Sequence, residues 1–353
     1  MDRNIINLRE SETLQGVLLV CVAAATISSS GLLVKASQVD GVVLYSKFSV
    51  TLFSELLKLC FATVVWLHAN YSSSNATLDR ERNHSATGKF PTTADVLRFS
   101  VPGILYLIVN NIKYPISERV NPGVIAVVWN LKIFGIAVLL KFALGREITV
   151  RRWVGVTFLS IGSILTEFSQ WDWHNKGGKE TNTQLQGLML LAIGLIIVSI
   201  ANVTCEHLYK GNSTDTSIPL HKQNVVLYSW GFTLNAGMWL IQKEVGGLGL
   251  LDNYTPWTVA VVISNAMGGY LIGAMFKYLD SIAATFADLI AMLATASLSA
   301  IFFDLDVNVW FCVGFIISSL SIYIYYVEKD GSYGNASKER SEIEVPQLTD
   351  LST

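Results

Sequence analysis

Charged residues are scarce in this chain of 353 residues, of which only 15% are Asp, Glu, Lys or Arg. Soluble domains carry roughly 25%. Hydrophobic residues make up 51% of the chain and its mean hydropathy is +0.44, which excludes an ordinary soluble protein. The net charge of −2 argues against nucleic acid as a partner, because binding a phosphate backbone requires a basic surface.

Motifs for catalysis and for ATP binding are also lacking. The four cysteines lie inside hydrophobic stretches, so we expect buried thiols rather than a disulfide framework or a metal site. No glycine-rich loop ends in Gly-Lys-Ser or Gly-Lys-Thr, so the sequence contains no visible ATP-driven motor. No nucleophile–base pair is evident either. An enzyme is therefore the least favoured class, and no cofactor or metal is expected.

Long hydrophobic stretches predominate instead. Ten are long enough to cross a bilayer as helices, at about 13–34, 42–67, 94–117, 122–143, 150–168, 185–208, 223–242, 257–278, 282–303 and 309–326. The pattern predicts an all-α membrane protein with ten transmembrane helices. The first stretch, preceded by residues 1–12, is too long for a signal peptide. Outside the helices we expect a loop at 169–184 and a disordered tail at 327–353.

The distribution of Lys and Arg predicts the orientation in the membrane. With the N-terminus in the cytosol, sixteen of these residues fall in cytosolic segments and helix ends, and six fall on the opposite side. Because basic residues are enriched on the cytosolic side, both termini are predicted to be cytosolic and 169–184 to be luminal.

Glycosylation sequons test this orientation. Seven occur, and only the one at Asn253 falls in a non-cytosolic loop. The cluster at 70–83 is therefore expected to be unused. The opposite interpretation, in which the cluster marks a luminal loop, stays open, but the distribution of charges is the preferred guide because short sequons arise by chance.

A polar stripe runs along the second stretch. Lys47, Thr51, Ser54, Glu55 and Lys58 fall within an arc of roughly 100° on a helix. Each ionisable group costs on the order of 3 kcal/mol at bilayer depth, so the stripe must face a polar interior. It indicates a pathway for a charged cargo.

The third and fourth stretches add further polar candidates. Tyr106, Asn110, Lys113 and Tyr114 share one helical face, and such side chains can stack on a nucleobase or bond to it. A polar interface between helices is the alternative. Lys132 lies mid-membrane and needs an anion, which is either the Glu55 carboxylate or a phosphate of the cargo.

The second half holds fewer candidates. Glu206 and Lys210 have the i,i+4 spacing of a local ion pair. Gly269 and Gly273 favour close helix packing. Asp288 is a lone acid among apolar residues, and it is either a proton-coupling group or a partner for Lys132 or Lys47.

Several blocks in this order resemble the nucleotide-sugar transporter family, in the branch of CMP-sialic acid, UDP-galactose and UDP-N-acetylglucosamine carriers. The blocks are Glu55–Lys58, YLIVNNIKY at 106–114, NLKI at 130–133, GRE at 145–147, Glu206–Lys210, QNVVLY at 223–228, GG at 268–269 and KYLD at 277–280. The resemblance covers about residues 15–326.

The resemblance implies a drug/metabolite transporter-like fold of two inverted five-helix repeats, 13–168 and 185–326, around a central cavity. It implies exchange of a cytosolic nucleotide sugar for the luminal nucleoside monophosphate. The expected location is the Golgi membrane, with the ER as the alternative, since the tail lacks a retrieval signal. Besides its cargo, the expected partners are membrane lipid and, as an open expectation, a second copy in a homodimer.

The family's motifs also imply roles for single residues. Lys132 matches the phosphate-contacting lysine. The matching cavity positions are Tyr106, Asn110 or Asn111, Asn224 and Tyr228. The remaining charged candidates would balance the charge of the cavity: Lys47, Glu55, Lys58, Glu206, Lys210, Lys277 and Asp288.

One block departs from the family. Many members have Asn and Lys where this chain has Ser281 and Ala284, and Asp288 adds a negative charge nearby. The change favours a runner-up, a related exporter of another organic ion. A scaffold that organises glycosylation enzymes without transport is the third interpretation.

Overall fold

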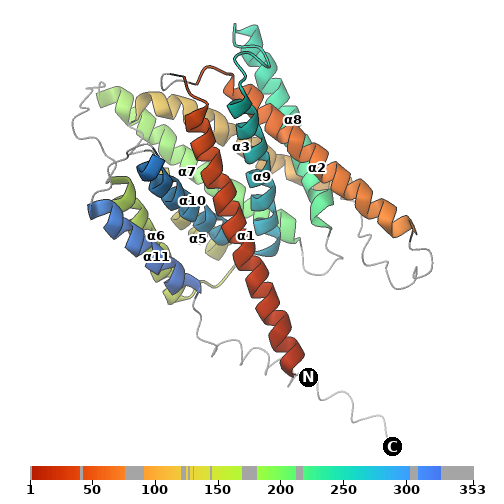
Figure 1. Cartoon of the computed structure of the whole chain (residues 1–353), viewed down its shortest axis with the longest axis vertical. Helices are drawn as coiled ribbons and strands as arrows, with labels where there is room; N and C mark the ends of the chain where they lie inside the picture. The colour runs from red at the N-terminus through yellow and green to blue at the C-terminus, as the bar shows by residue number, and fades with distance from the viewer. Residues whose placement is uncertain are drawn as a thin grey trace, which may run out of the picture.

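The computed structural model describes residues 2–39, 43–75, 91–120, 125, 128–129, 131–143, 145–168, 181–211, 218–302 and 309–326. Every regular element in these residues is a helix (Figure 1). The ten helices are α1 (Asp2–Ala36), α2 (Lys47–Asn75), α3 (Thr93–Arg119), α5 (Lys132–Ala143), α6 (Val150–Phe168), α7 (Thr181–Lys210), α8 (Leu220–Glu244), α9 (Pro256–Tyr278), α10 (Ser281–Phe302) and α11 (Val309–Tyr326). The expected all-α class is confirmed.

Each hydrophobic stretch coincides with one of these helices, with differences at the ends. Helix α1 begins at Asp2, so it includes the polar residues expected to precede the first crossing. Helix α2 begins at Lys47 and ends at Asn75, later at both ends than predicted. The start of the fourth stretch, most of the 169–184 loop and the 327–353 tail lie outside the described residues.

In the part of the chain that the structure describes, four helices are long and apolar enough to cross a membrane. The crossing segments are Leu14–Val34, Lys47–Tyr71, Leu185–Lys210 and Pro256–Tyr278. Large apolar side chains remain exposed on their outer faces, among them Leu18, Phe61 and Ile196. Exposed large apolar side chains along such helices indicate contact with another apolar phase, so the outer faces suit a lipid environment.

Side chains cap the start of three of the helices. Thr92 caps α3 in a reciprocal pair with Asp95, and Thr255 caps α9 in the same way with Thr258. Asp280 precedes α10, and its carboxylate accepts a hydrogen bond from the backbone N–H of Ala283 at 2.7 Å. Such caps satisfy backbone N–H groups that have no partner within the helix.

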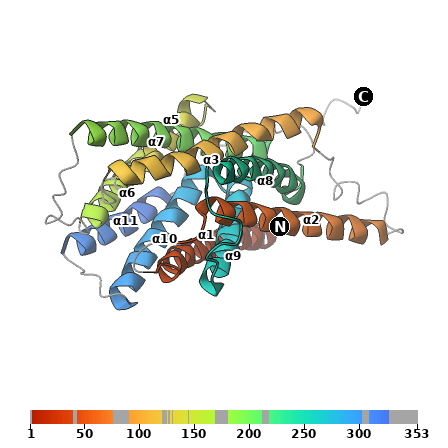
Figure 2. The same ribbon diagram turned by 90° about the horizontal axis from the view of Figure 1, so that it is seen from above.

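The helices pack in pairs. Helix α6 packs along α11 at one side of the bundle, and α2 packs along α8 at the other, in both views (Figures 1 and 2). Between them, α3 packs on α7, and α1 packs on both α9 and α10. The α6–α11 contact is close because glycines line it: a Cβ on Gly314 would lie 2.5 Å from the backbone N of Thr166.

Helix α10 joins two apolar clusters. Its Phe286 packs with Ile133 of α5 and Leu159 of α6. Its Ala283 packs with Phe99 of α3 and Met275 of α9. Lipid is as apolar as these side chains, so close packing rather than withdrawal from water holds such helices together. The clusters fix α10 beside the cavity described next.

Candidate functional site

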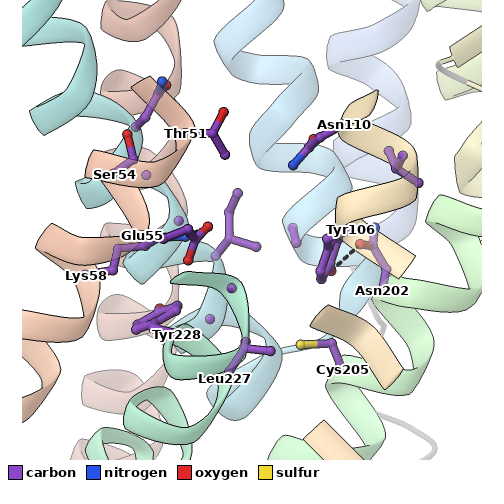
Figure 3. Close-up of a pocket in the computed structure, with 18 of the residues that line it drawn as sticks. Thr51, Ser54, Glu55, Lys58, Tyr106, Asn110, Asn202, Cys205, Leu227 and Tyr228 are labelled. Atoms are coloured by element: carbon purple, nitrogen blue, oxygen red, sulfur yellow. Dashed lines mark hydrogen bonds and ion pairs between the residues drawn. The ribbon is translucent and has the colours of Figure 1, made fainter. Parts of the chain in front are cut away.

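A cavity of about 610 Å³ lies inside the bundle and is lined by residues of α1, α2, α3, α5, α7, α8, α9 and α10. Neither α6 nor α11 contributes a lining residue. Figure 3 shows the polar stripe of α2 on one wall, with Tyr106, Asn110 and Asn202 facing it from the other. Thr51, Ser54, Glu55 and Lys58 of the stripe line the cavity as predicted, whereas Lys47 is not among the lining residues.

Lys132 is paired with Asp288 in the wall of the cavity. Its Nζ lies 2.8 Å from Asp288 Oδ2, and the side chains of Lys132 and Asp288 are 10% and 34% exposed. The pair joins the first residue of α5 to the second turn of α10. Of the partners considered for Lys132, the structure therefore selects Asp288 and not Glu55.

Glu55 is instead paired within its own helix. Lys58 Nζ donates to Glu55 Oε1 at 2.6 Å, and it lies 4.8 Å from the centre of the Tyr228 ring. Two glycines make room for the pair: a Cβ on Gly231 would lie 2.6 Å from Glu55 Oε2, and one on Gly269 would lie 3.1 Å from Lys58 Cδ. Gly269 was expected to serve helix packing, and here it borders a charged side chain.

Tyr106 and Asn110 line the cavity from α3, as their shared face predicts. The Tyr106 hydroxyl donates to Asn202 Oδ1 at 2.8 Å (Figure 3). Asn111 does not line the cavity, because its side chain donates to the backbone carbonyl of Leu107 one turn earlier at 2.8 Å. The side chains of Lys113 and Tyr114 lie outside the described residues.

Tyr228 lines the cavity from α8, whereas Asn224 lies behind the wall. Asn224 Oδ1 accepts a hydrogen bond from the hydroxyl of Tyr209, which is itself a lining residue. The Tyr228 hydroxyl and the Asn224 amide nitrogen are buried with no hydrogen-bond partner among the described residues. A buried polar atom without a partner is costly, so each is available to a bound polar molecule that reaches it.

Three of the expected cavity charges lie at one end of the bundle instead. Glu206 is only 2% exposed, and its carboxylate accepts from Arg146 at 2.9 Å and from Lys210 at 2.6 Å. It also accepts from the backbone N–H of Ser281 at 2.8 Å and from its hydroxyl at 2.6 Å. This Glu206 network ties α7 to α10 and to the segment between α5 and α6. The expected Glu206–Lys210 ion pair is confirmed.

Lys277 is also a structural link and not a cavity residue. Its Nζ donates to the backbone carbonyls of Tyr209 and Ile218 at 2.6 and 3.0 Å, and to Gln223 Oε1 at 3.1 Å. Glu206, Lys210 and Lys277 are all absent from the cavity lining. Their absence from the lining follows from the direction of their side chains, because the neighbouring residues Cys205, Tyr209 and Phe276 do line the cavity.

Sequence reasoning missed several residues of this region. Tyr209 and Asn265 line the cavity, and Asn265 accepts a hydrogen bond from Ser30 at 2.5 Å. The sequence did contain a signal for Asn265, because its polar amide lies inside an apolar stretch. Arg146 was part of the GRE block, but its bond to a residue 60 positions later had no signal in helical spacing.

Interior polar groups inside an apolar helical bundle are typical of membrane proteins with a polar pathway. The family model described as nucleotide-sugar transporter matches residues 11–326. The chain therefore belongs to the nucleotide-sugar transporter family.

Individual relatives agree with the family. The chain is 27% identical over 320 residues to the Probable UDP-sugar transporter protein SLC35A4 of Xenopus tropicalis, covering 90% of this chain and 94% of the relative. It is 26% identical to CMP-sialic acid transporter 1 of Oryza sativa subsp. japonica, covering 89% and 95%.

A solved structure, named only "Crystal structure of protein", shares the fold. It superposes with a TM-score of 0.64 at 11% identity, covering 88% of this chain and 96% of the other. At that identity the likeness concerns the fold alone.

Proposed function

We propose that the protein is a nucleotide-sugar antiporter of the Golgi membrane, which imports a cytosolic pyrimidine nucleotide sugar in exchange for the nucleoside monophosphate. The observation that carries the proposal is the interior cavity itself, with a buried cation at Lys132 and tyrosines on two walls. A cavity of about 610 Å³ is within the range of small-molecule sites. UDP-galactose, UDP-N-acetylglucosamine and CMP-sialic acid are the candidate cargoes.

The cavity suggests a role for each lining group. Lys132 would bind the phosphate, since a buried ammonium requires an anion. The rings of Tyr106 and Tyr228 would contact the nucleobase or ribose. Asn110 would bond to the base or sugar from α3, and Asn224 would act through the hydroxyl of Tyr209, which separates it from the cavity.

The pairing of helices supports ten crossings arranged as two inverted five-helix repeats, 13–168 and 185–326. In such an arrangement the first five helices correspond in order to the last five, α1 to α7, α2 to α8, α3 to α9, α5 to α10 and α6 to α11. Under this correspondence the α3–α7 contact becomes α9–α1, α5–α7 becomes α10–α1 and α3–α8 becomes α9–α2. All six contacts occur. The α2–α8 and α6–α11 contacts convert into themselves. Repeats of this kind place a transporter's site at their interface, where Lys132 of the fourth segment meets Asp288 of the ninth.

The Glu206 network suggests how one end of the cavity closes. It joins α7, α10 and Arg146 at the end that the distribution of Lys and Arg assigns to the cytosol. In alternating access one end opens while the other closes. Binding of cargo from the cytosol would then require the network to separate.

Uptake into liposomes tests the proposal. Purified protein would be reconstituted into vesicles preloaded with UMP, CMP or GMP, and the uptake of labelled nucleotide sugars would be measured. We expect uptake with one matching monophosphate and a fall of at least about tenfold in Lys132→Ala, because a charged hydrogen bond contributes roughly 1.5–3 kcal/mol.

Lys141→Ala is the matched control for that variant. Lys141 belongs to the same helix but is exposed, so its loss should leave uptake unchanged. Equal uptake by Lys132→Ala and the wild type would contradict the assigned role of Lys132. No uptake under any preload would contradict nucleotide-sugar exchange.

One observation favours a second candidate, an exporter of another organic ion. Because Asp288 already neutralises Lys132, the cavity has less attraction for a diphosphate than an unpaired lysine would give it. If this candidate is correct, the protein takes up another organic ion, and excess UMP or CMP does not reduce that uptake.

A further inference from the structure

The charged residues of the cavity lining form two pairs. Among the described lining residues, the charged side chains are Glu55, Lys58, Lys132 and Asp288, paired at 2.6 and 2.8 Å. The first pair lies within one helix, three residues apart. The second joins two helices across 156 positions of sequence, so its two groups can separate when the helices or side chains move.

The two members of the second pair differ in exposure. Lys132 is 10% exposed and Asp288 is 34% exposed, so the ammonium is the more deeply buried group. The carboxylate on α10, one turn after the lining residue Ala284, is the more accessible to a molecule in the cavity. An anion in the cavity must therefore come close to Asp288 in order to neutralise Lys132.

The Asp288 carboxylate accepts the same charged hydrogen bond from the Lys132 ammonium that a cargo phosphate would accept. Ammonium–carboxylate and ammonium–phosphate hydrogen bonds share a length of about 2.7–2.9 Å, and the observed 2.8 Å lies within it. A cargo phosphate brought to the same ammonium would also lie close to the Asp288 carboxylate, and like charges at short range repel.

We propose that Asp288 is an internal competitor for Lys132, which occupies the ammonium in the empty carrier and must be displaced by an anionic cargo. The proposal rests on the proposed function, because it assumes that the cargo carries a phosphate. It makes Asp288 a residue that sets cargo affinity: binding must break the internal pair, and release re-forms it. Release is thereby favoured in a carrier that has no ATP motor.

Binding of UMP and CMP to the purified full chain tests the competition. Asp288→Asn keeps the size of the side chain and removes its charge, and we expect it to tighten binding about tenfold, which corresponds to about 1.4 kcal/mol. Asp288→Glu keeps the charge and should bind as weakly as the wild type. Glu244→Gln, which removes a negative charge from an exposed position at the end of α8, should change nothing.

The outcomes separate this proposal from the proposed function. If the wild type binds a monophosphate and Asp288→Asn binds it equally or more weakly, the competition is wrong and the nucleotide-sugar carrier stands. If neither protein binds or transports any nucleotide, both proposals are wrong.

Exchange and net transport in the same vesicles give a second readout that a merely structural role would not alter. The internal pair leaves the empty cavity without an unpaired charge, so the wild-type carrier should return empty at a low rate, and a small uptake without preload should accompany the faster exchange. In Asp288→Asn the Lys132 charge has lost its internal partner, and we expect uptake without preload to fall relative to exchange. An unchanged ratio in folded Asp288→Asn protein would overturn the competition.

Discussion

Replacing Glu206 by Gln tests the Glu206 network most directly. The variant keeps the shape of the side chain and removes its charge. Removing one partner of a buried ion pair costs about 3–5 kcal/mol. Here Arg146 and Lys210 are 42% and 30% exposed, so water can solvate them in the variant, and the Gln carbonyl can still accept from the Ser281 N–H. We therefore expect a loss of about 2–3 kcal/mol.

Thermal unfolding of the protein in detergent measures this loss. We expect the midpoint for Glu206→Gln to fall by several degrees, since a protein of this size shifts by a few degrees per kcal/mol at most. Glu147→Gln is the control: it makes the same chemical change one residue after Arg146 at an exposed position, where substitutions stay within about 0.5 kcal/mol.

Labelling of Cys205 reports whether the network also closes the cavity. Cys205 precedes Glu206, lines the cavity and is 1% exposed. The assay uses a variant that keeps Cys205 as its single cysteine. We expect Glu206→Gln to raise the rate of maleimide labelling about tenfold for each 1.4 kcal/mol by which it destabilises the closed state relative to the open state. Reduced thermal stability with unchanged labelling would refute the closing role and leave the network a purely structural one.

Three further predictions concern packing, the cavity wall and glycosylation. Gly314→Ala should destabilise the protein by about 1–3 kcal/mol because α6 leaves no room for the methyl group, whereas Gly237→Ala, with nothing within 4 Å of its Cβ, should be neutral or stabilising in thermal unfolding. Tyr106→Phe should keep most of the nucleotide uptake and Tyr106→Ala should lose it, because the ring makes the proposed stacking contact; equal loss in both would assign the effect to the hydroxyl. Asn253→Gln should leave gel mobility unchanged, since the Asn253 amide donates to Leu44 O at 3.1 Å and Thr255 of the same sequon caps α9; a mobility shift on deglycosylation that this variant abolishes would contradict the prediction.

The helices were predictable because long apolar stretches have few alternatives in a membrane. The polar faces were predictable because their residues repeat with helical spacing. Thr51, Glu55 and Lys58 do so on one helix, and Tyr106 and Asn110 do so on another. Helical periodicity acts over a few turns, so it gives the direction of a side chain within its own helix.

Contacts between helices were not predictable in this way. The sequence left Glu55, Asp288 and a phosphate as partners of Lys132, and only the packing of α5 against α10 selects Asp288 over Glu55 as the partner within the protein. Lys277 was assigned to the cavity through the family resemblance, as part of the KYLD block at 277–280. It lies at the end of α9, where the carbonyl groups that end α7 accept its hydrogen bonds, and hydropathy does not distinguish these two surroundings.

The close contact between α6 and α11 has a consequence for motion. These two helices meet through glycines with backbone atoms in contact distance, and neither reaches the cavity. Packed surfaces of this kind resist sliding, because the side chains and backbone of one helix fill the gaps of the other. We therefore expect the α6–α11 pair to keep its geometry in any conformational change that opens or closes the cavity.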